Sequence, residues 1–284
     1  MEQVIDSSAK SSTVSKFKLP GVKRVIAVAS GKGGVGKSTV ATNLALALAA
    51  EGNRVGLLDA DIYGPSQGLM MGVPDGTKPN VANDLLQPII AHGLQCMSMS
   101  FVASDRTPAV WRGPMASGAL QQLLTQTEWQ AVDVLVVDMP PGTGDIQLTM
   151  AQNVPLAGAV IVTTPQDIAL LDARKGIEMF RKVAVPLLGI VENMSTHTCS
   201  ECGHQEAIFG EGGGDAIAAE YDLNVLARLP LSMAIRMQSD GGQPPLIADP
   251  QGPVSLQFRE MARTIMASLE AANNTGPVIQ ILED

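Results

Sequence analysis

Residues 25–49 read VIAVASGKGGVGKSTVATNLALALA, and this stretch decides the fold. The apolar run Val25–Ala29 predicts a buried strand, and the pattern over Lys37–Glu51 predicts a helix. The spacing G-x-x-x-x-G-K-S between them is that of a phosphate-binding P-loop. Glycines let backbone N–H groups turn onto phosphate oxygens, and the helix N-terminus adds partial positive charge. We therefore expect the segment to bind ATP through Gly31, Lys32, Gly33, Gly34, Val35, Gly36, Lys37, Ser38 and Thr39.

Two lysines and a serine in this loop have different expected roles. Lys37 should reach the β- and γ-phosphates, and the Ser38 hydroxyl should bind Mg²⁺. Lys32 is not needed to hold phosphate in its own subunit. Its expected use is to reach the phosphates of a partner's nucleotide across a dimer, the alternative being a solvated lysine where a loop begins.

Carboxylates follow two further predicted strands, in VGLLDADIYGPS and in DVLVVDMPPGTGD. Phosphoryl transfer needs Mg²⁺ near the phosphates and a group that orients the attacking water. We expect Asp138 to help hold Mg²⁺, Asp61 to orient the water, and Asp59 to hold the loop or the metal shell. The N–H of Gly142 could bind the γ-phosphate and act as a switch. Asp145 and Asp59 could instead be ordinary helix caps.

Short Val/Ile/Leu runs alternate with helical stretches, which is typical of a doubly wound, mostly parallel α/β sheet flanked by helices. We expect a P-loop NTPase domain over residues 21–272, a flexible segment over 1–20 and a tail over 273–284. The Pro-, Gly- and Met-rich part from Gly64 to Pro114 should be an irregular excursion beside the site. The predicted strands are Val25–Ala29, Arg54–Leu58, Val134–Val137, Ala159–Thr163, Leu187–Val191 and Val225–Leu229. The predicted helices are Lys37–Glu51, Ala116–Thr125, Ile168–Lys182, Gly214–Glu220 and Val254–Ala271.

Composition narrows the possible partners. The 284 residues carry a net charge of −9, and no run of Lys or Arg forms a basic patch. We therefore expect no nucleic-acid partner. No apolar stretch is long enough for a membrane span and no secretory signal is present, so we expect a cytoplasmic protein without a membrane partner.

Two of the three cysteines form Cys199-x-x-Cys202, after the strand predicted over Leu187–Val191. A four-iron cluster needs four ligands, which two copies of the pair would supply across a twofold axis. The same dimer could hold zinc, with His197 and His204 as further candidates, or the pair could be a thiol–disulfide switch. The residues alone leave these three readings open. Cys96 lies in an apolar run and is expected to be a buried small hydrophobe.

Six motifs together resemble the Mrp/ApbC group, ATP-dependent iron–sulfur cluster carriers related to MinD and ParA. They are GKGGVGKST (31–39), LLDADIYGPS (57–66), VWRGPMAS (110–117), DMPPGTGDIQLT (138–149), TTPQDIALLDARKGI (163–177), and GIVENMS with CSECG (189–195 and 199–203).

The resemblance implies a P-loop homodimer of the deviant Walker A type with ATP between the subunits, in which Lys32 acts in trans and Asp61 positions water. It implies that Asn193 contacts adenine and that backbone near Pro230 closes over the base. It favours a [4Fe–4S] cluster bridging two subunits through Cys199 and Cys202, delivered to apo iron–sulfur proteins. Many members also begin with an additional domain. Only about 20 residues precede the first predicted strand here, so we do not expect the partner contacts that such a domain would make.

Two other function classes compete with a carrier. A positioning or partition ATPase, with zinc or a redox pair at the cysteines, should have a basic DNA-facing surface or an amphipathic membrane helix. A metabolic kinase or reductase should have an acceptor pocket, and no motif indicates one. We therefore expect an ATP-hydrolysing iron–sulfur carrier.

Overall fold

The P-loop strand β1 (Val22–Ala29) lies inside a sheet whose order is β12-β9-β8-β1-β7-β2-β6-β5. The computed structural model describes residues 16–102 and 113–274, and in this part every neighbouring pair of the sheet is parallel except β5 with β6. The doubly wound, mostly parallel sheet expected from the sequence is therefore confirmed. Its other strands are β2 (Val55–Asp59), β5 (Ile89–Ala91), β6 (Leu94–Ser98), β7 (Val132–Asp138), β8 (Leu156–Thr163), β9 (Leu187–Glu192) and β12 (Val225–Arg228).

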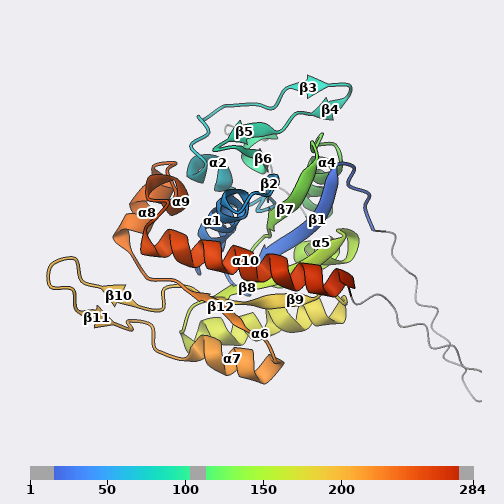
Figure 1. Ribbon diagram of the computed structural model, residues 1–284. Coiled ribbons are helices and arrows are strands. Elements are labelled where there is room, and N and C mark those ends of the chain that lie inside the picture. Colours follow the sequence, from blue (N-terminus) through green and yellow to red (C-terminus); the bar gives the residue numbers. More distant parts are fainter. Residues whose placement is uncertain (1–15, 103–112, 275–284) are drawn as a thin grey trace, which may run out of the picture.

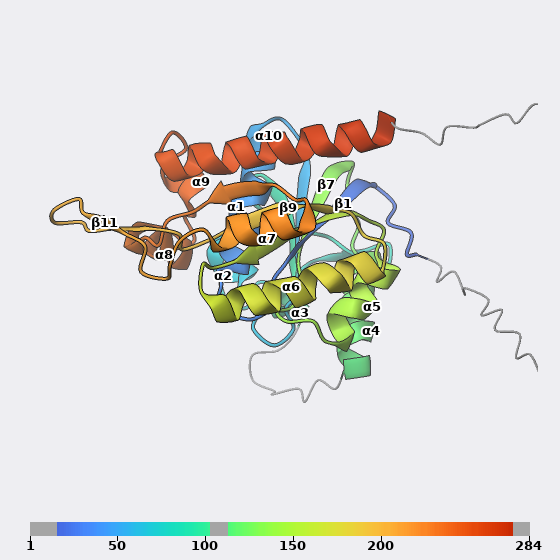
Figure 2. The same cartoon turned by 90° about the horizontal axis from the view of Figure 1, so that it is seen from below.

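Helices cover both faces of this sheet (Figures 1 and 2). On one face α1 (Lys37–Ala50) packs against β7 and β2 and is covered by α10 (Pro253–Asn274). The other face carries α4 (Gly113–Thr125), α5 (Asp145–Asn153), α6 (Asp167–Lys182) and α7 (Gly213–Tyr221). The shorter helices are α2 (Gln67–Met70), α3 (Met99–Val102), α8 (Met233–Asp240) and α9 (Pro245–Ala248). Two small hairpins stand apart from the sheet, β3 (Val81–Ala82) with β4 (Leu85–Leu86) and β10 (His197–Thr198) with β11 (Gln205–Glu206).

The P-loop helix α1 is buried almost all the way round. Its residues from Val40 to Leu48 are all buried, which suits a helix lying between a sheet and a second helix. The covering helix α10 turns one apolar stripe inward, formed by Phe258, Met261, Ala262, Ile265 and Leu269. This packing fixes the direction of α1, and therefore where its N-terminus points.

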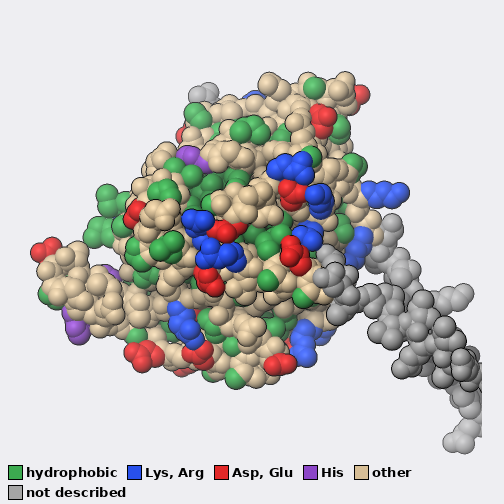
Figure 3. All heavy atoms as spheres, viewed as in Figure 1, with side chains coloured by type: hydrophobic (Ala, Val, Ile, Leu, Met, Phe, Trp, Pro, Cys, Tyr) green, Lys and Arg blue, Asp and Glu red, His purple; other side chains and the backbone are tan. Residues whose placement is uncertain are grey.

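The outer face of α10 is charged. Figure 3 shows Lys and Arg interspersed with Asp and Glu over this side of the molecule. Arg259 and Arg263 of α10 both contact Glu51 at the end of α1, with Nε of Arg259 2.6 Å from the Glu51 carboxylate. These contacts lower the pKa of Glu51, chiefly through the Arg259 hydrogen bond.

The structure corrects the prediction for Gly64–Pro114. This segment is not only an irregular excursion, because β6 inside it is a parallel strand of the main sheet beside β2. It also contributes α2, which touches α1. Residues 103–112 of the segment lie outside the described residues, as do most of the expected N-terminal segment and C-terminal tail.

Two smaller points complete the comparison with the predicted elements. Helix α5 was missed because it has only nine residues and directly follows the loop rich in proline and glycine after β7. Cys96 is buried in β6, as expected. Within residues 16–102 and 113–274, no helix has the length and apolar character that a membrane crossing requires.

Candidate functional site

The P-loop joins the end of β1 to the start of α1 and packs closely against its surroundings. Gly34 and Gly36 both adopt φ of 82°, a left-handed conformation that favours glycine. A Cβ at Gly31 would lie 1.9 Å from the carbonyl oxygen of Asp172 in α6. A Cβ at Gly36 would lie 2.1 Å from Nδ2 of Asn193. The loop therefore depends on glycine both for its conformation and for two close approaches.

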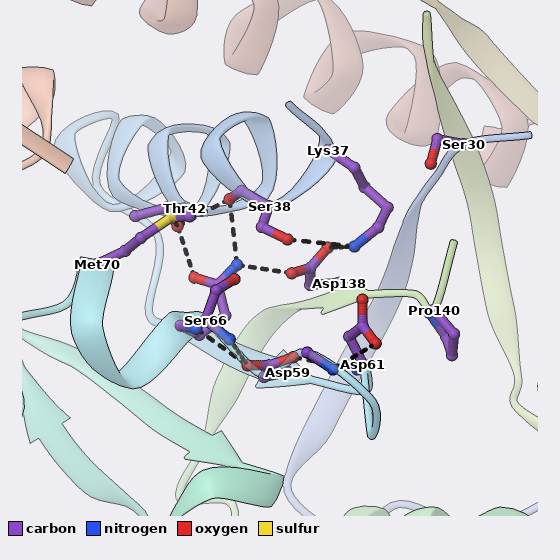
Figure 4. Close-up of polar contacts among 12 residues, drawn as sticks. Ser30, Lys37, Ser38, Thr42, Asp59, Asp61, Ser66, Met70, Asp138 and Pro140 are labelled. Carbon is purple, nitrogen blue, oxygen red and sulfur yellow. Dashed lines mark hydrogen bonds and ion pairs between the residues drawn. The ribbon is translucent and has the colours of Figure 1, made fainter. Parts of the chain in front are cut away.

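Lys37 lies buried at the base of the loop, where its Nζ forms an ion pair with Oδ1 of Asp138 at the end of β7 (Figure 4). Its Nζ is also 3.3 Å from the Ser38 hydroxyl. Lys37 and Ser38 of one sequence motif and Asp138 of another are thus brought together, as expected of one site. Oxygen donors from a hydroxyl and a carboxylate beside a phosphate loop are the ligands that Mg²⁺ prefers.

Asp59 at the end of β2 is fully buried and holds a turn together. Its two oxygens accept hydrogen bonds from the N–H groups of Asp61, Ser66 and Gln67 at 2.9–3.1 Å and from the Ser98 hydroxyl at 3.0 Å. Burial, followed by the negative charge of the neighbouring Asp138, raises the pKa of Asp59 to about 7. The sequence analysis expected Asp59 to hold either the loop or the metal shell, and these contacts favour the first role.

Asp61 stands within this turn and is 9% exposed. Its Oδ1 accepts the N–H of Gly64 at 3.2 Å. Figure 4 shows its carboxylate on the same side as Asp138 and the chain at Pro140. The carboxylate therefore lies on the side of the site where the sequence predicts a water-positioning group.

The chain after β7 forms a tight loop that Gln147 of α5 fastens. Gln147 is buried, its Oε1 accepts the N–H of Gly144 at 2.6 Å, and its Nε2 donates to the Pro140 carbonyl at 2.8 Å. Between these points, Gly142 adopts φ of 97° and donates its N–H to the Ser30 carbonyl at 3.0 Å. The N–H expected to bind a γ-phosphate therefore donates here to the start of the P-loop.

Lys32 is half-buried, and the Ser30 hydroxyl donates to its carbonyl at 2.8 Å. Across residues 16–102 and 113–274 its ammonium group has no acidic partner. Such a cation at the start of a phosphate loop is available to an anion from outside the subunit.

Asn193 follows β9 and contacts the P-loop directly. Its Nδ2 donates to the Val35 carbonyl at 2.8 Å. Pro230, half-buried after β12, lies beside this segment, because Ser195 donates both its N–H and its hydroxyl to the Leu229 carbonyl at 2.9 and 3.1 Å. The two residues expected near the adenine are thus on neighbouring segments at one end of the loop.

The cysteines lie on a hairpin that projects from the body of the protein (Figures 1 and 2). We call residues 194–212, which carry β10 and β11, the cysteine arm. Cys199 donates its N–H to the His204 carbonyl and accepts that of Gly203, both at 2.9 Å, so the arm turns tightly at its tip. The Cys202 and then the Glu201 N–H lower the pKa of Cys199, which favours the thiolate that binds metals.

One copy of the arm does not form a complete metal site. His197 is engaged with the Leu231 carbonyl through Nδ1 at 3.2 Å, and His204 is exposed. No group of three or more His, Cys, Asp or Glu side chains suited to a metal occurs in the described part of the chain.

Both ends of the cysteine arm are tied by one carboxylate. Glu192 is buried at the end of β9, immediately before Asn193, and its Oε2 accepts the N–H of Gly214 in α7 at 2.5 Å. Glu192, Gln67 and Gln147 were all missed in the sequence. Glu192 and Gln67 contact residues far along the chain. Gln147 contacts only nearby residues, and it stands three residues after Gly144 at the usual capping-box spacing.

Comparison with known proteins finds a matching family model and several relatives of this chain. The family model for ParA, described as NUBPL iron-transfer P-loop NTPase, matches residues 21–266. An iron–sulfur cluster carrier protein of Pseudomonas fragi is 65% identical, covering 87% of this chain and 86% of its own. The mouse iron–sulfur cluster transfer protein NUBPL is 50% identical, covering 89% and 80%. A nucleotide-binding protein of Archaeoglobus fulgidus, solved with ADP, is 35% identical with a TM-score of 0.72, covering 84% of this chain and 93% of its own.

Proposed function

The chain belongs to the ParA family of NUBPL-type iron-transfer P-loop NTPases, and we propose that it is an ATP-hydrolysing carrier of iron–sulfur clusters. In this proposal the cluster is a cargo, held between two copies of the chain and passed to apo iron–sulfur proteins. The resemblance to the Mrp/ApbC group and the names of the relatives support the cargo. In the proposal, Cys199 and Cys202 of the cysteine arm bind the iron of the cluster.

The observation that carries this proposal is the direct link between the cysteine arm and the P-loop. Asn193 donates to the Val35 carbonyl inside the loop, and Cys199 follows six residues later along the same segment. The hydrogen bond to Val35 leaves Oδ1 and the second amide hydrogen of Asn193 for a nucleotide base. A base that binds Asn193 would therefore contact the residue that directly precedes the cysteine arm.

The residues around the loop account for ATP hydrolysis. The oxygen of a water molecule attacks the γ-phosphorus, the bond from that phosphorus to the β–γ bridging oxygen breaks, and ADP and phosphate leave. Asp61 orients the water, while Lys37 leaves Asp138 and neutralises the β- and γ-phosphate oxygens. Lys32 of a second copy adds positive charge from across the interface. This role is supported by the ammonium group having no acidic partner within the described part of its own chain.

The residues at the base of the loop fit a magnesium ion. The Ser38 hydroxyl and the Asp138 carboxylate would hold it, with Asp59 supporting the turn beside them. When bound, Mg²⁺ supplies charge neutralisation at the β- and γ-phosphates. The fit rests on the donor atoms, since a buried carboxylate that already pairs with a cation is here adjacent to a hydroxyl.

The cluster site requires two copies of the chain. Each cysteine arm provides two thiols, and a [4Fe–4S] cluster takes four thiolates. The lowered pKa of Cys199 and the exposure of Cys202 make the pair reactive and accessible. Shared ligands at an exposed tip also suit release, because transfer to an acceptor proceeds by exchange of ligands. Free cysteines that must stay reduced agree with a cytoplasmic carrier.

Anaerobic reconstitution with iron and sulfide tests the proposal. We expect a brown dimer with about four iron atoms per pair of chains, and its loss in Cys199→Ser and Cys202→Ser. Cys96→Ala is the matched control, because that thiol is buried in β6 and should leave the cluster unchanged.

Two other results would contradict the proposal in different ways. Zinc in place of iron in anaerobically purified protein would indicate the structural metal site that the sequence also allowed. A reconstituted dimer that activates no apo iron–sulfur acceptor would favour a positioning ATPase instead.

A further inference from the structure

Gln67, the first residue of α2, lies at the centre of the buried polar cluster and has no role in the proposal above. It is 2% exposed. Its Nε2 donates to Oδ2 of Asp138 at 2.8 Å and to the Ser38 carbonyl at 3.1 Å. Every polar atom of the side chain therefore points into the base of the phosphate loop, and none toward solvent.

The position of Gln67 matters because two carboxylates end on neighbouring strands. Asp59 of β2 and Asp138 of β7 are paired in the parallel register. Gln67 donates its backbone N–H to Asp59 at 3.0 Å and its side-chain amide to Asp138. It thus supplies a donor to each of two buried carboxylates that would otherwise face each other with fewer partners.

The contacts of Asp138 show when Gln67 becomes essential. Within the described residues, the Asp138 carboxylate has two side-chain partners, Lys37 at Oδ1 and Gln67 at Oδ2. Lys37 must leave to contact phosphates, which frees Oδ1. The amide of Gln67 is then the side chain that keeps the carboxylate plane in place.

We propose that Gln67 is a positioning residue for magnesium, which holds Asp138 oriented toward the ion that accompanies the nucleotide. This inference rests on the proposed function, because it assumes that Mg²⁺ and a nucleotide bind together at the P-loop. Gln67 also ends the turn closed by Asp59. Its side-chain amide binds the Asp138 carboxylate and its backbone N–H binds Asp59, so one residue connects the metal-binding carboxylate to the turn that carries Asp61.

The partners of the Gln67 amide fix its orientation. The Asp138 carboxylate and the Ser38 carbonyl can only accept hydrogen bonds, so the NH₂ side must face them. Oε1 then faces the Thr42 hydroxyl of α1, which lies 2.5 Å away and donates to it. The cluster therefore specifies both the place of the side chain and its direction.

The test compares Gln67→Met with the wild-type full chain. Methionine has a similar volume but lacks the amide, so the fold is retained while all three side-chain hydrogen bonds are lost. Binding of Mn²⁺ to the protein–ADP complex, measured by electron paramagnetic resonance, should weaken about 10-fold to 100-fold, the usual cost of losing a group that orients a metal ligand. ADP affinity without metal should stay within about twofold of wild type.

Gln95→Met is the matched control. Gln95 in β6 also makes two hydrogen bonds, to the N–H and the carbonyl of Gln130, both at 2.8 Å, but far from the phosphate loop. It should leave Mn²⁺ affinity unchanged. If Gln67→Met does not fold, Thr42→Val provides the second test, with a Mn²⁺ affinity about 3-fold to 10-fold lower because one neutral hydrogen bond is lost.

Two outcomes would contradict the role proposed for Gln67, and they can be distinguished from each other. In the first, the wild-type protein binds Mn²⁺ in the presence of ADP, and Gln67→Met or a folded Thr42→Val binds it equally well. That result would overturn this inference alone. Wild-type protein that binds no Mn²⁺ with ADP would overturn the proposed function, and this inference with it.

Discussion

Replacing Gly31 with alanine should nearly abolish ATP hydrolysis. A Cβ at this position would stand 1.9 Å from the Asp172 carbonyl oxygen and 2.1 Å from its carbon. These are backbone atoms inside α6, so no side chain can swing away. The loop would have to recede by about 1.5 Å to reach ordinary van der Waals contact. Since misplacement of reacting groups by about 1 Å can cost about 100-fold in rate, we expect a loss of at least that size.

Phosphate release at saturating ATP measures this loss, with circular dichroism to confirm that the variant folds. Gly33→Ala is the comparison within the loop, because its Cβ would meet no atom closer than 3.9 Å, and it should lose much less. Gly118→Ala in α4 has open space around its Cβ and should keep the full rate. Hydrolysis by Gly31→Ala within about threefold of wild type would refute the argument from close packing.

Three further predictions concern stability and thiol reactivity. Hydrogen bonds from Arg54 and Lys23 hold the pKa of Asp133 well below its usual range. The stabilisation is therefore present above about pH 4 and lost as the pH falls below that, so urea unfolding of wild type and Asp133→Asn should converge in acid. At neutral pH, iodoacetamide should label Cys199 rapidly and Cys96 only after unfolding, because burial raises the pKa of Cys96 to about 12. Phe258→Ala, at a position 1% exposed in α10, should lower the free energy of unfolding by about 3–5 kcal/mol.

Each of these predictions has an internal check. Leu256→Ala in the same helix, at a position 46% exposed, should change the free energy of unfolding by less than about 0.5 kcal/mol. Mass spectrometry of urea-unfolded protein should show all three cysteines labelled. An unfolding difference between wild type and Asp133→Asn that is the same at pH 3 and pH 7 would contradict the ion-pair assignment.

Local sequence predicted the strand–loop–helix unit and most of the parallel sheet. β1, β2, β7, β8 and β9 carry apolar runs because both of their faces are buried, and such runs are visible without a structure. β6 was missed because Gln95 interrupts its run, LQCMS, and because the run follows a stretch rich in proline and glycine. Its place beside β2 depends on hydrogen bonds to a strand almost forty residues away, which no local pattern contains.

The candidate site was also predicted only in part. Lys37, Ser38, Asp59 and Asp138 were expected together because the carboxyl ends of parallel strands meet at one edge. Gln67 could not be anticipated, since a glutamine in a short helix carries no motif. Its meaning comes only from four hydrogen bonds to partners on β2, β7 and α1.

The attachment of the cysteine arm has a consequence for protein engineering. The arm leaves the sheet after Glu192 and returns at α7, and the Glu192 carboxylate holds the two ends together through Gly214. A segment whose ends are already joined can be exchanged without moving the strands beneath it. The tip of the arm is thus a graftable module: a different metal-binding hairpin placed between His197 and Gly213 would keep the contacts of Ser195 and His197 with Leu229 and Leu231 and the attachment of Asn193 to the P-loop. Under the proposed function, a short turn in its place would leave the nucleotide site without the cluster ligands.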